Sequence, residues 1–414
     1  MRIIDVDAHL HEPLDWVERT DPELAAELGP PARFLDIASS VFGFRDRAFA
    51  ALPPEQQPTE RWDLVPPGFV THLEMTDERQ PDGHEASGQD PFYGAEGRLQ
   101  FCDERGIDVQ FLNPTFLVGA FVQAGRAGRV DLLGRVRQTW NQWAANQVSG
   151  HTDRLIPVTQ IDLGDVEGSI AEMTRMRGLG SRAFVLPEAP VSRGRRAVSA
   201  DGRHLARSIT HPDFEPVWDA AEDLGMAAFA HVGFARERIN PGWANNGSDS
   251  LLTFNMLNFI ANQTGPQLLL AAMVLDGVFA RHPKLTVVVE EVGIDWLPHL
   301  TSALDASIGR KPAVLVDDEY RPSNLAEGST YTLPLAPVEY LRRQVRVTPL
   351  PALQPLDPVI RQVPPEMLCF STDYPHVEGA SDAVALCSRQ LDLAGVDDDV
   401  RAGFFGGVGD LLGV

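Results

Sequence analysis

Lysine, cysteine and long apolar runs are all scarce in this chain of 414 residues. Lys284 and Lys311 are the only lysines, so any mechanism that needs a lysine has just two candidates. The 3 cysteines are odd in number and widely spaced, which is typical of reduced thiols rather than of a disulfide framework. No stretch approaches the roughly 18 apolar residues of a membrane-spanning helix. The start, MRIIDVDAHLHEP, carries acids and histidines where a secretion signal needs a basic start and an apolar run. We therefore expect a cytoplasmic protein.

Basic residues are also outnumbered by acidic ones. The chain has 35 Lys+Arg against 58 Asp+Glu, which gives a net charge of −23. A protein that binds nucleic acid or an anionic membrane needs a basic patch, and the sequence contains none. With 43% hydrophobic residues the chain can still bury a large core. The composition therefore predicts a globular protein whose partner is a small molecule, with neither nucleic acid nor membrane as a partner.

Eight short apolar or β-branched runs predict eight strands. The run LTVVVEE is almost continuously hydrophobic, as in a strand that is covered on both faces. The predicted strands are Ile3–His9, Ile107–Asn113, Leu155–Ile161, Arg182–Leu186, Ala227–Val232, Leu285–Glu291, Gln344–Thr348 and Met367–Asp373. Helical patterns lie between them, at Leu132–Asn146, Val166–Arg177, Phe214–Leu224, Leu268–Arg281 and Ser381–Leu393.

This alternation predicts an α/β fold in which a parallel sheet closes into a (β/α)8 TIM barrel. A doubly wound open sheet is the alternative, but the glycine-rich turn expected after its first strand is absent. Residues 1–414 then form a single domain with long loop insertions. The longest, 14–100, directly follows the first strand, so we expect it to form a cap or lid at the C-terminal face, where barrel enzymes build their sites.

Polar side chains end three of the predicted strands. Asp7 and His9 lie two residues apart on the first strand and therefore point to the same face. His231 ends the fifth strand and Asp373 ends the eighth, each after an apolar run. Alone, each residue could be a helix cap or a buried core residue. Together, at one mouth of a barrel, two imidazoles and two carboxylates are typical of a mononuclear site for zinc, manganese or iron.

In these segments the sequence resembles the amidohydrolase superfamily, in the branch that includes aminocarboxymuconate-semialdehyde decarboxylase and aromatic-acid decarboxylases. The matching motifs run in family order over nearly the whole chain. They are IIDVDAHLHEP, ERGIDVQFLNPT, DFEPVWDAAEDLGMAAFAHVG, GVFARHPKLTVVVEEVGIDWLPH and LCFSTDYPH. The resemblance implies a metal-centred barrel whose ligands come from strands one, five and eight, and a protein that often dimerises.

Carried over, the implied ligands are Asp7, His9, His231 and Asp373, with Asp7 in place of the family's first histidine. His11 is then a neighbour of the site, although the register in which His9 and His11 are the ligand pair remains open. Binuclear relatives bridge two metals with a lysine at the end of strand four, and neither lysine of this chain lies there. We therefore expect one divalent ion, with zinc as the first choice and manganese or iron as alternatives.

The decarboxylases of this branch have a histidine where this chain has Glu291. A carboxylate can act as general base toward water, but it cannot donate and accept at once as a neutral imidazole does. The alternative role for Glu291 is a helix cap or the partner of an arginine. Glu290 is expected to point the other way and to be structural.

Three function hypotheses follow. The first is a metal-dependent hydrolase that uses metal-activated water on a small amide, ester, lactone or C–C bond, with Glu291, Asp373 and His231 as the catalytic group. The second is a metal-dependent non-oxidative decarboxylase of a small, often aromatic, carboxylic acid. The third is a non-catalytic binding barrel. For substrate binding the candidates are His376, His11, Arg236 and Trp243.

Overall fold

A computed structural model describes residues 1–31, 94–186, 191–192, 206–232, 263–309, 333–350, 354–376, 379–380 and 382–414. Its central feature is a curled sheet of 7 parallel strands in the order β1-β2-β3-β4-β7-β8-β9. These strands are β1 (Ile4–Leu10), β2 (Val109–Pro114), β3 (Leu155–Thr159), β4 (Ala183–Val185), β7 (Ala227–His231), β8 (Val287–Glu290) and β9 (Val345–Val347). Seven of the eight predicted strands are therefore confirmed, with bounds that differ by one or two residues.

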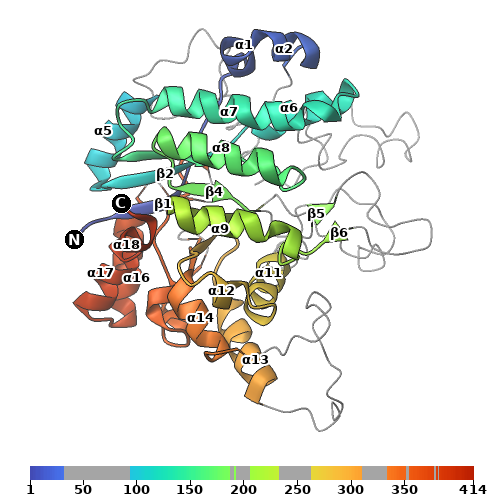
Figure 1. Cartoon of the computed structure of the whole chain (residues 1–414). Coiled ribbons are helices and arrows are strands. Elements are labelled where there is room, and N and C mark those ends of the chain that lie inside the picture. Colours follow the sequence, from blue (N-terminus) through green and yellow to red (C-terminus); the bar gives the residue numbers. More distant parts are fainter. Residues whose placement is uncertain are drawn as a thin grey trace, which may run out of the picture.

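Helices cover the outer face of this sheet (Figure 1). They are α1 (Trp16–Thr20), α2 (Pro22–Leu28), α5 (Ala95–Arg105), α6 (Leu117–Arg126), α7 (Leu133–Gln147), α8 (Val166–Gly178), α9 (Glu215–Leu224), α11 (Thr264–Leu275), α12 (Val278–Arg281), α13 (Leu297–Gly309), α14 (Pro337–Gln344), α15 (Asp357–Ile360), α16 (Ala383–Ala394), α17 (Asp398–Gly406) and α18 (Gly409–Leu412). A short antiparallel pair, β5 (Val191–Ser192) and β6 (Ala206–Arg207), lies apart from the sheet. The helix predicted over 268–281 is divided, because Gly277 adopts φ 75° and ends the first part.

The eighth predicted strand, Met367–Asp373, is not a regular strand, yet it occupies the eighth position of the ring. It makes single parallel bridges on both sides, Val347 to Leu368 and Ala8 to Tyr374. The main-chain N–H of Asp373 donates to the carbonyl of Asp7 at 2.7 Å. We call residues 367–374 the closing segment. It joins β9 to β1, so the first and last parts of the barrel meet as the sequence predicted.

Alternate residues of the strands fill the interior of the barrel. One buried cluster combines apolar side chains from β1, β2, β3, β4, β7, β8 and the closing segment, among them Val6, Phe111 and Val288. Val408 and Leu412 join the same cluster from the C-terminal end of the chain. In Figure 1, α17 and α18 lie beside the start of β1, close to both termini. This part of the interior is therefore a packed core, and the polar residues Asp7, His9 and His231 lie at the opposite ends of the strands.

The start of the predicted cap packs on the outside of the barrel wall. α1 contacts α7, and α2 contacts α6. Arg135 of α7 holds Asp21 at 2.7 Å, and the same Asp21 caps α2 through the N–H of Leu24. Residues 32–93 of the predicted cap lie outside the described residues.

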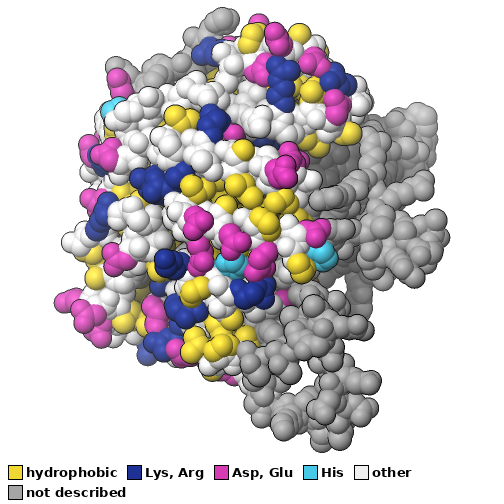
Figure 2. Space-filling view, in the orientation of Figure 1, with side chains coloured by type: hydrophobic (Ala, Val, Ile, Leu, Met, Phe, Trp, Pro, Cys, Tyr) yellow, Lys and Arg dark blue, Asp and Glu magenta, His cyan; other side chains and the backbone are white. Residues whose placement is uncertain are grey.

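Acidic and basic side chains are interspersed on the described part of the face shown in Figure 2. Arg281, for example, donates to Glu215 at 2.6 Å, and Arg175 pairs with Glu172 at 2.7 Å. Within the described ranges, none of the helices combines the length and the hydrophobicity that crossing a bilayer requires.

Candidate metal centre

A β-bulge in β1 brings two polar side chains to the open end of the barrel. The register of β1 against β2 shifts between Asp5 and Ala8, and a bulge of this kind re-aims the side chains around it. Asp5 therefore bonds to Gln110, on the outer face of the sheet, whereas Asp7 and His9 point to the inside. Both Asp7 and His9 are at most 1% exposed.

His231, Glu291 and Asp373 come from the ends of β7, β8 and the closing segment. His231 is the last residue of β7 and continues the inward-facing positions of that strand. Glu291 has φ 58° and Asp373 has φ 52°, the only two residues other than glycine with positive φ in the described part of the chain. Such a left-handed conformation is uncommon for a residue with a Cβ, and strained backbone of this kind clusters at functional sites. In each case it ends the strand and turns the carboxylate into the site.

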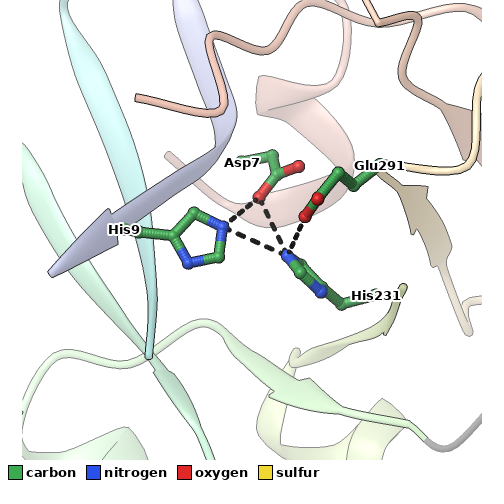
Figure 3. Close-up of side chains that lie close together, drawn as sticks. All are labelled: Asp7, His9, His231 and Glu291. Atoms are coloured by element: carbon green, nitrogen blue, oxygen red, sulfur yellow. Dashed lines mark hydrogen bonds and ion pairs between the residues drawn. The ribbon is translucent and has the colours of Figure 1, made fainter. Parts of the chain in front are cut away.

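Asp7, His9, His231 and Glu291 each place one ligand atom within 4.8 Å of all the others. Figure 3 shows the four side chains converging from three strands. The Nε2 atom of His231 lies 3.1 Å from Nε2 of His9, 3.5 Å from an Asp7 oxygen and 3.0 Å from a Glu291 oxygen. The Nε2 atom of His9 lies 3.3 Å from the same Asp7 oxygen.

A second group overlaps the first. His9, Glu291, Asp373 and His376 also place one atom each within 4.8 Å of one another. Asp373 lies 3.4 Å from Nε2 of His9 and 2.8 Å from Nδ1 of His376, and the rings of His9 and His376 lie 3.9 Å apart. The structure thus brings Asp7, His9, His231, Asp373 and Glu291 to one end of the barrel, with His376 beside them.

The donor set fits a divalent cation. Nδ1 of His9 lies 3.0 Å from the carbonyl oxygen of Pro114, and Nδ1 of His231 lies 2.8 Å from that of Val232. A carbonyl oxygen only accepts, so each Nδ1 carries a proton and the two Nε2 atoms face each other. At 3.1 Å the two nitrogens need a proton or a metal ion between them, because two facing lone pairs repel each other. Histidine ligands of metals are oriented in this way. Within the described residues, moreover, no donor reaches Oδ2 of the buried Asp7.

The pKa values follow the same electrostatics. Burial, together with His376, lowers the pKa of His9 to about 4, which keeps that ring neutral. Burial alone would raise the pKa of Asp7, but His231 and His9 outweigh it and hold that pKa below its usual range. Burial opposes the charge of His231, yet Glu291 and Asp7 raise its pKa well above the usual value. The site therefore attracts positive charge.

Glu290 and Asn113 belong to the surroundings of this group. Glu290 does not point the other way, as expected from simple alternation. It faces the interior beside His231, on the same side of β8 as Val288, and the left-handed conformation of Glu291 turns the second carboxylate to the same end. Asn113 donates from Nδ2 to an Asp7 oxygen and to a Glu290 oxygen, each at 3.2 Å. The sequence reasoning missed Asn113, although its place at the end of an apolar run is the signal that identified the other site residues.

Of the candidates for substrate binding, His11 and His376 lie in the described part of the chain, and Arg236 and Trp243 do not. His11 is buried, and its ring lies 5.0 Å from that of Phe116 and 6.4 Å from that of His376. In the described residues, His9 rather than His11 shares a possible ligand group with Asp7.

Comparisons with known proteins cover the whole chain. A family model described as amidohydrolase matches residues 4–407. No curated protein sequence matches the chain.

Among solved structures, an amidohydrolase from Mycobacterium avium subsp. paratuberculosis has a TM-score of 0.66 at 20% identity, and the match covers 100% of this chain and 98% of that protein. The 5-carboxyvanillate decarboxylase of Novosphingobium aromaticivorans, complexed with manganese and 4-hydroxy-3-methoxy-5-nitrobenzoic acid, has a TM-score of 0.58 at 17% identity, covering 100% and 96%. The dihydroxybenzoic acid decarboxylase of Polaromonas sp., with bound manganese and 2-nitroresorcinol, has 0.57 at 14% identity, covering 100% and 97%. At these identities the likeness shows the barrel fold.

Proposed function

Because the chain belongs to the amidohydrolase family, as a metal-dependent hydrolase or carboxy-lyase, we propose that it hydrolyses a small amide, ester, lactone or activated C–C bond. The observation that carries this proposal is the place of Glu291. Its carboxylate lies 3.0 Å from His231, inside the group of possible metal ligands, in a left-handed backbone conformation. A carboxylate that is held there can accept a proton from water, which is what hydrolysis needs and a histidine-dependent decarboxylation does not.

In this proposal Asp7, His9, His231 and Asp373 would hold one divalent ion. Zinc is our first choice, because two imidazoles and two carboxylates suit it, and manganese or iron are the alternatives. When bound, such an ion supplies Lewis acidity, which polarises a substrate oxygen and makes water more acidic. Pro114 and Val232 keep the two imidazoles in the tautomer that presents Nε2.

Each remaining residue has a separate task. Glu291 accepts the proton that the attacking water loses. His376 accepts or donates a proton at Nε2, which lies 3.4 Å from the hydroxyl of Thr115, and its Nδ1 faces Asp373 at 2.8 Å. These contacts support the proposal that His376 protonates the leaving group. His11 borders the same region, and we keep it, Arg236 and Trp243 as candidates for substrate contact.

A second candidate function is non-oxidative decarboxylation of a small aromatic acid. The full-length structural likeness to two manganese-containing decarboxylases favours it. In that reaction a C–C bond breaks, CO2 leaves, and a proton takes its place on the carbon. We propose that Asp373 and His376, which lie 2.8 Å apart, deliver that proton.

One isotope experiment separates the two reactions. The purified protein is incubated with a panel of esters, amides, lactones and aromatic acids, first in H2(18)O and then in D2O. Hydrolysis places one (18)O in the new carboxylate of the product. Decarboxylation releases CO2 and places deuterium on the carbon that lost it. CO2 release without (18)O in the organic product would overturn the hydrolase proposal in favour of the second candidate.

A further inference from the structure

Two buried charged side chains lie behind the metal centre, on the outer face of the sheet. Asp5 belongs to β1 and Arg98 to α5, and each is 0% exposed. Neither belongs to the groups that could hold a metal. Both lie at the junction of β1 with the closing segment, which carries Asp7 and His9 on one side and Asp373 on the other.

Asp5 binds the main chain on both sides of this junction. One of its oxygens accepts from the N–H of Thr372 at 2.8 Å and from that of Asp7 at 3.3 Å. The other accepts from the Thr372 hydroxyl at 2.6 Å. Asp7 is a proposed ligand and Thr372 directly precedes another, Asp373. The Asp5 carboxylate thus holds the backbone of Asp7 and the backbone of the residue just before Asp373.

Arg98 binds the carbonyl side of the same junction. Its guanidinium donates to the carbonyl oxygen of His9, and at 3.5 Å to that of Tyr374. The guanidinium carbon lies 5.0 Å from the centre of the Tyr374 ring, which stacks on Phe101 at 3.9 Å. His9 is a proposed ligand, and Tyr374 directly follows Asp373. Asp5 and Arg98 therefore bracket the ligands from the N–H side and the carbonyl side.

Gln110 connects the two charges. Its Nε2 donates to Asp5 at 2.7 Å, and its Oε1 accepts from Arg98 at 3.5 Å. An amide with a donor at one end and an acceptor at the other is the side chain that can satisfy both ions. Buried charges are tolerated when they are compensated and fully hydrogen-bonded in this way.

The irregular backbone explains why side chains are needed at this junction. The bulge in β1 and the left-handed Asp373 interrupt the regular ladder between β1 and the closing segment. Asp5 and Arg98 bond four main-chain groups here, the N–H groups of Asp7 and Thr372 and the carbonyls of His9 and Tyr374. The carbonyl of Tyr374 also accepts from the N–H of His9 at 2.8 Å. A junction built from regular strands would need neither charge, but it could not turn Asp7, His9 and Asp373 to one point.

We propose that Asp5 and Arg98 are positioning residues of the metal centre: they hold the backbone of Asp7, His9 and Asp373 from the outer face of the sheet and so set the affinity and geometry of the bound ion. The proposal rests on the proposed metal site. According to this proposal, Asp5 and Arg98 do more than close the barrel: they also contribute to binding of the ion. Substitution of a side chain that orients metal ligands typically weakens metal binding by about 10–100-fold.

The test compares Asp5→Asn and Arg98→Met with Gln344→Met as a matched control. Gln344 is also a buried polar side chain that bonds two carbonyl oxygens, those of His282 (2.7 Å) and Leu285 (3.1 Å), but at the opposite ends of the strands. For each protein the thermal unfolding midpoint is measured without metal, and the Kd for Mn²⁺ is measured by electron paramagnetic resonance. The visible spectrum of the Co²⁺-loaded protein then reports the ligand geometry.

We expect all three variants to lose thermal stability. Only Asp5→Asn and Arg98→Met should weaken Mn²⁺ binding, by about 10–100-fold, and change the Co²⁺ spectrum. Arg98→Lys, which restores one donor, should recover part of the affinity. If Arg98→Met does not fold, Asp5→Asn and the milder Thr372→Val, which removes one of the four bonds to Asp5, decide the question.

Two contrary results are distinguishable. Folded Asp5→Asn and Thr372→Val that bind Mn²⁺ with wild-type affinity and spectrum would overturn the positioning role while leaving the metal site intact. A wild-type protein that binds neither Mn²⁺ nor Co²⁺ would overturn the metal site itself, and the positioning role with it.

Discussion

The Nε2 atoms of His9 and His231 face each other at 3.1 Å, while each ring donates its Nδ1 proton to a carbonyl oxygen behind it. Such a pair is stable only with positive charge between the two nitrogens, and Asp7 and Glu291 add negative charge at the same point. The predictions that follow test whether this charge is a metal ion and what the carboxylates around it do.

His231→Ala should lose most of the bound metal while the protein stays folded, because the side chain lies at a strand end and not in the apolar interior. The measurement is metal per protein by mass spectrometry, with circular dichroism to check the fold. His151→Ala is the control, since His151 lies in none of the possible ligand groups of the described residues. Full metal occupancy in His231→Ala would remove His231 from the ligand set.

Glu291→Gln should retain the metal and lower kcat by roughly 10²–10⁴-fold, since the amide keeps the size of the side chain but cannot accept the proton. The neighbouring Glu290→Gln is the matched control. Burial raises the pKa of Glu290 well above its usual value, and its carboxyl accepts from Nδ2 of Asn113, so we expect its replacement by an amide to change kcat little. Steady-state kinetics on a substrate from the panel measures both. Equal kcat in the two variants would exclude Glu291 as the base.

Asn113→Leu should weaken metal binding about 10–100-fold, because the variant removes the amide that bonds both Asp7 and Glu290. Asn141→Leu provides the comparison. Asn141 is equally buried and bonds Gln160 and Glu172 through the same atom, but away from the centre. Titration with Mn²⁺ should show weaker binding only for Asn113→Leu, and unchanged affinity there would show that Asn113 does not orient Asp7.

Glu12 should give the folded protein a pH-dependent stability. Burial raises the pKa of Glu12 to about 7, although the N–H groups of Phe116 and Thr115 and the indole of Trp140 donate to it. The folded pKa lies above the unfolded one, so the stabilisation is complete below pH ~4.5 and is lost as the pH rises to about 7. Urea unfolding across this range should show wild type losing about 3 kcal/mol relative to Glu12→Gln. If the free energies of unfolding of wild type and Glu12→Gln changed equally with pH, the pKa of Glu12 would not be raised.

The sequence predicted most of the barrel because its strands are short apolar runs buried on both faces. The same periodicity placed Asp7 and His9 together and put His231 and Asp373 at the correct strand ends. It did not predict that the segment before Asp373 lacks a regular ladder, because a left-handed residue cannot be read from hydrophobicity.

Glu290 and Glu291 show where the rule of strand alternation fails. Alternation places two successive residues on opposite faces, and the left-handed Glu291 breaks that rule where the strand ends. The bulge in β1 was invisible for a similar reason, since it depends on pairing with β2 and not on local composition. Asp5 and Arg98 could not be connected from sequence because 93 residues separate them and only the closed barrel brings them together.

The most direct test of the metal centre is anomalous diffraction from crystals of protein purified without added metal or chelator, recorded above and below the absorption edge of zinc, manganese and iron. We predict one anomalous peak, at about 2.0–2.3 Å from the ligand atoms of Asp7, His9, His231 and Asp373. A peak bound elsewhere, a second peak of equal height bridged by Glu291, or the absence of any peak at these residues would contradict a single ion held by these four ligands.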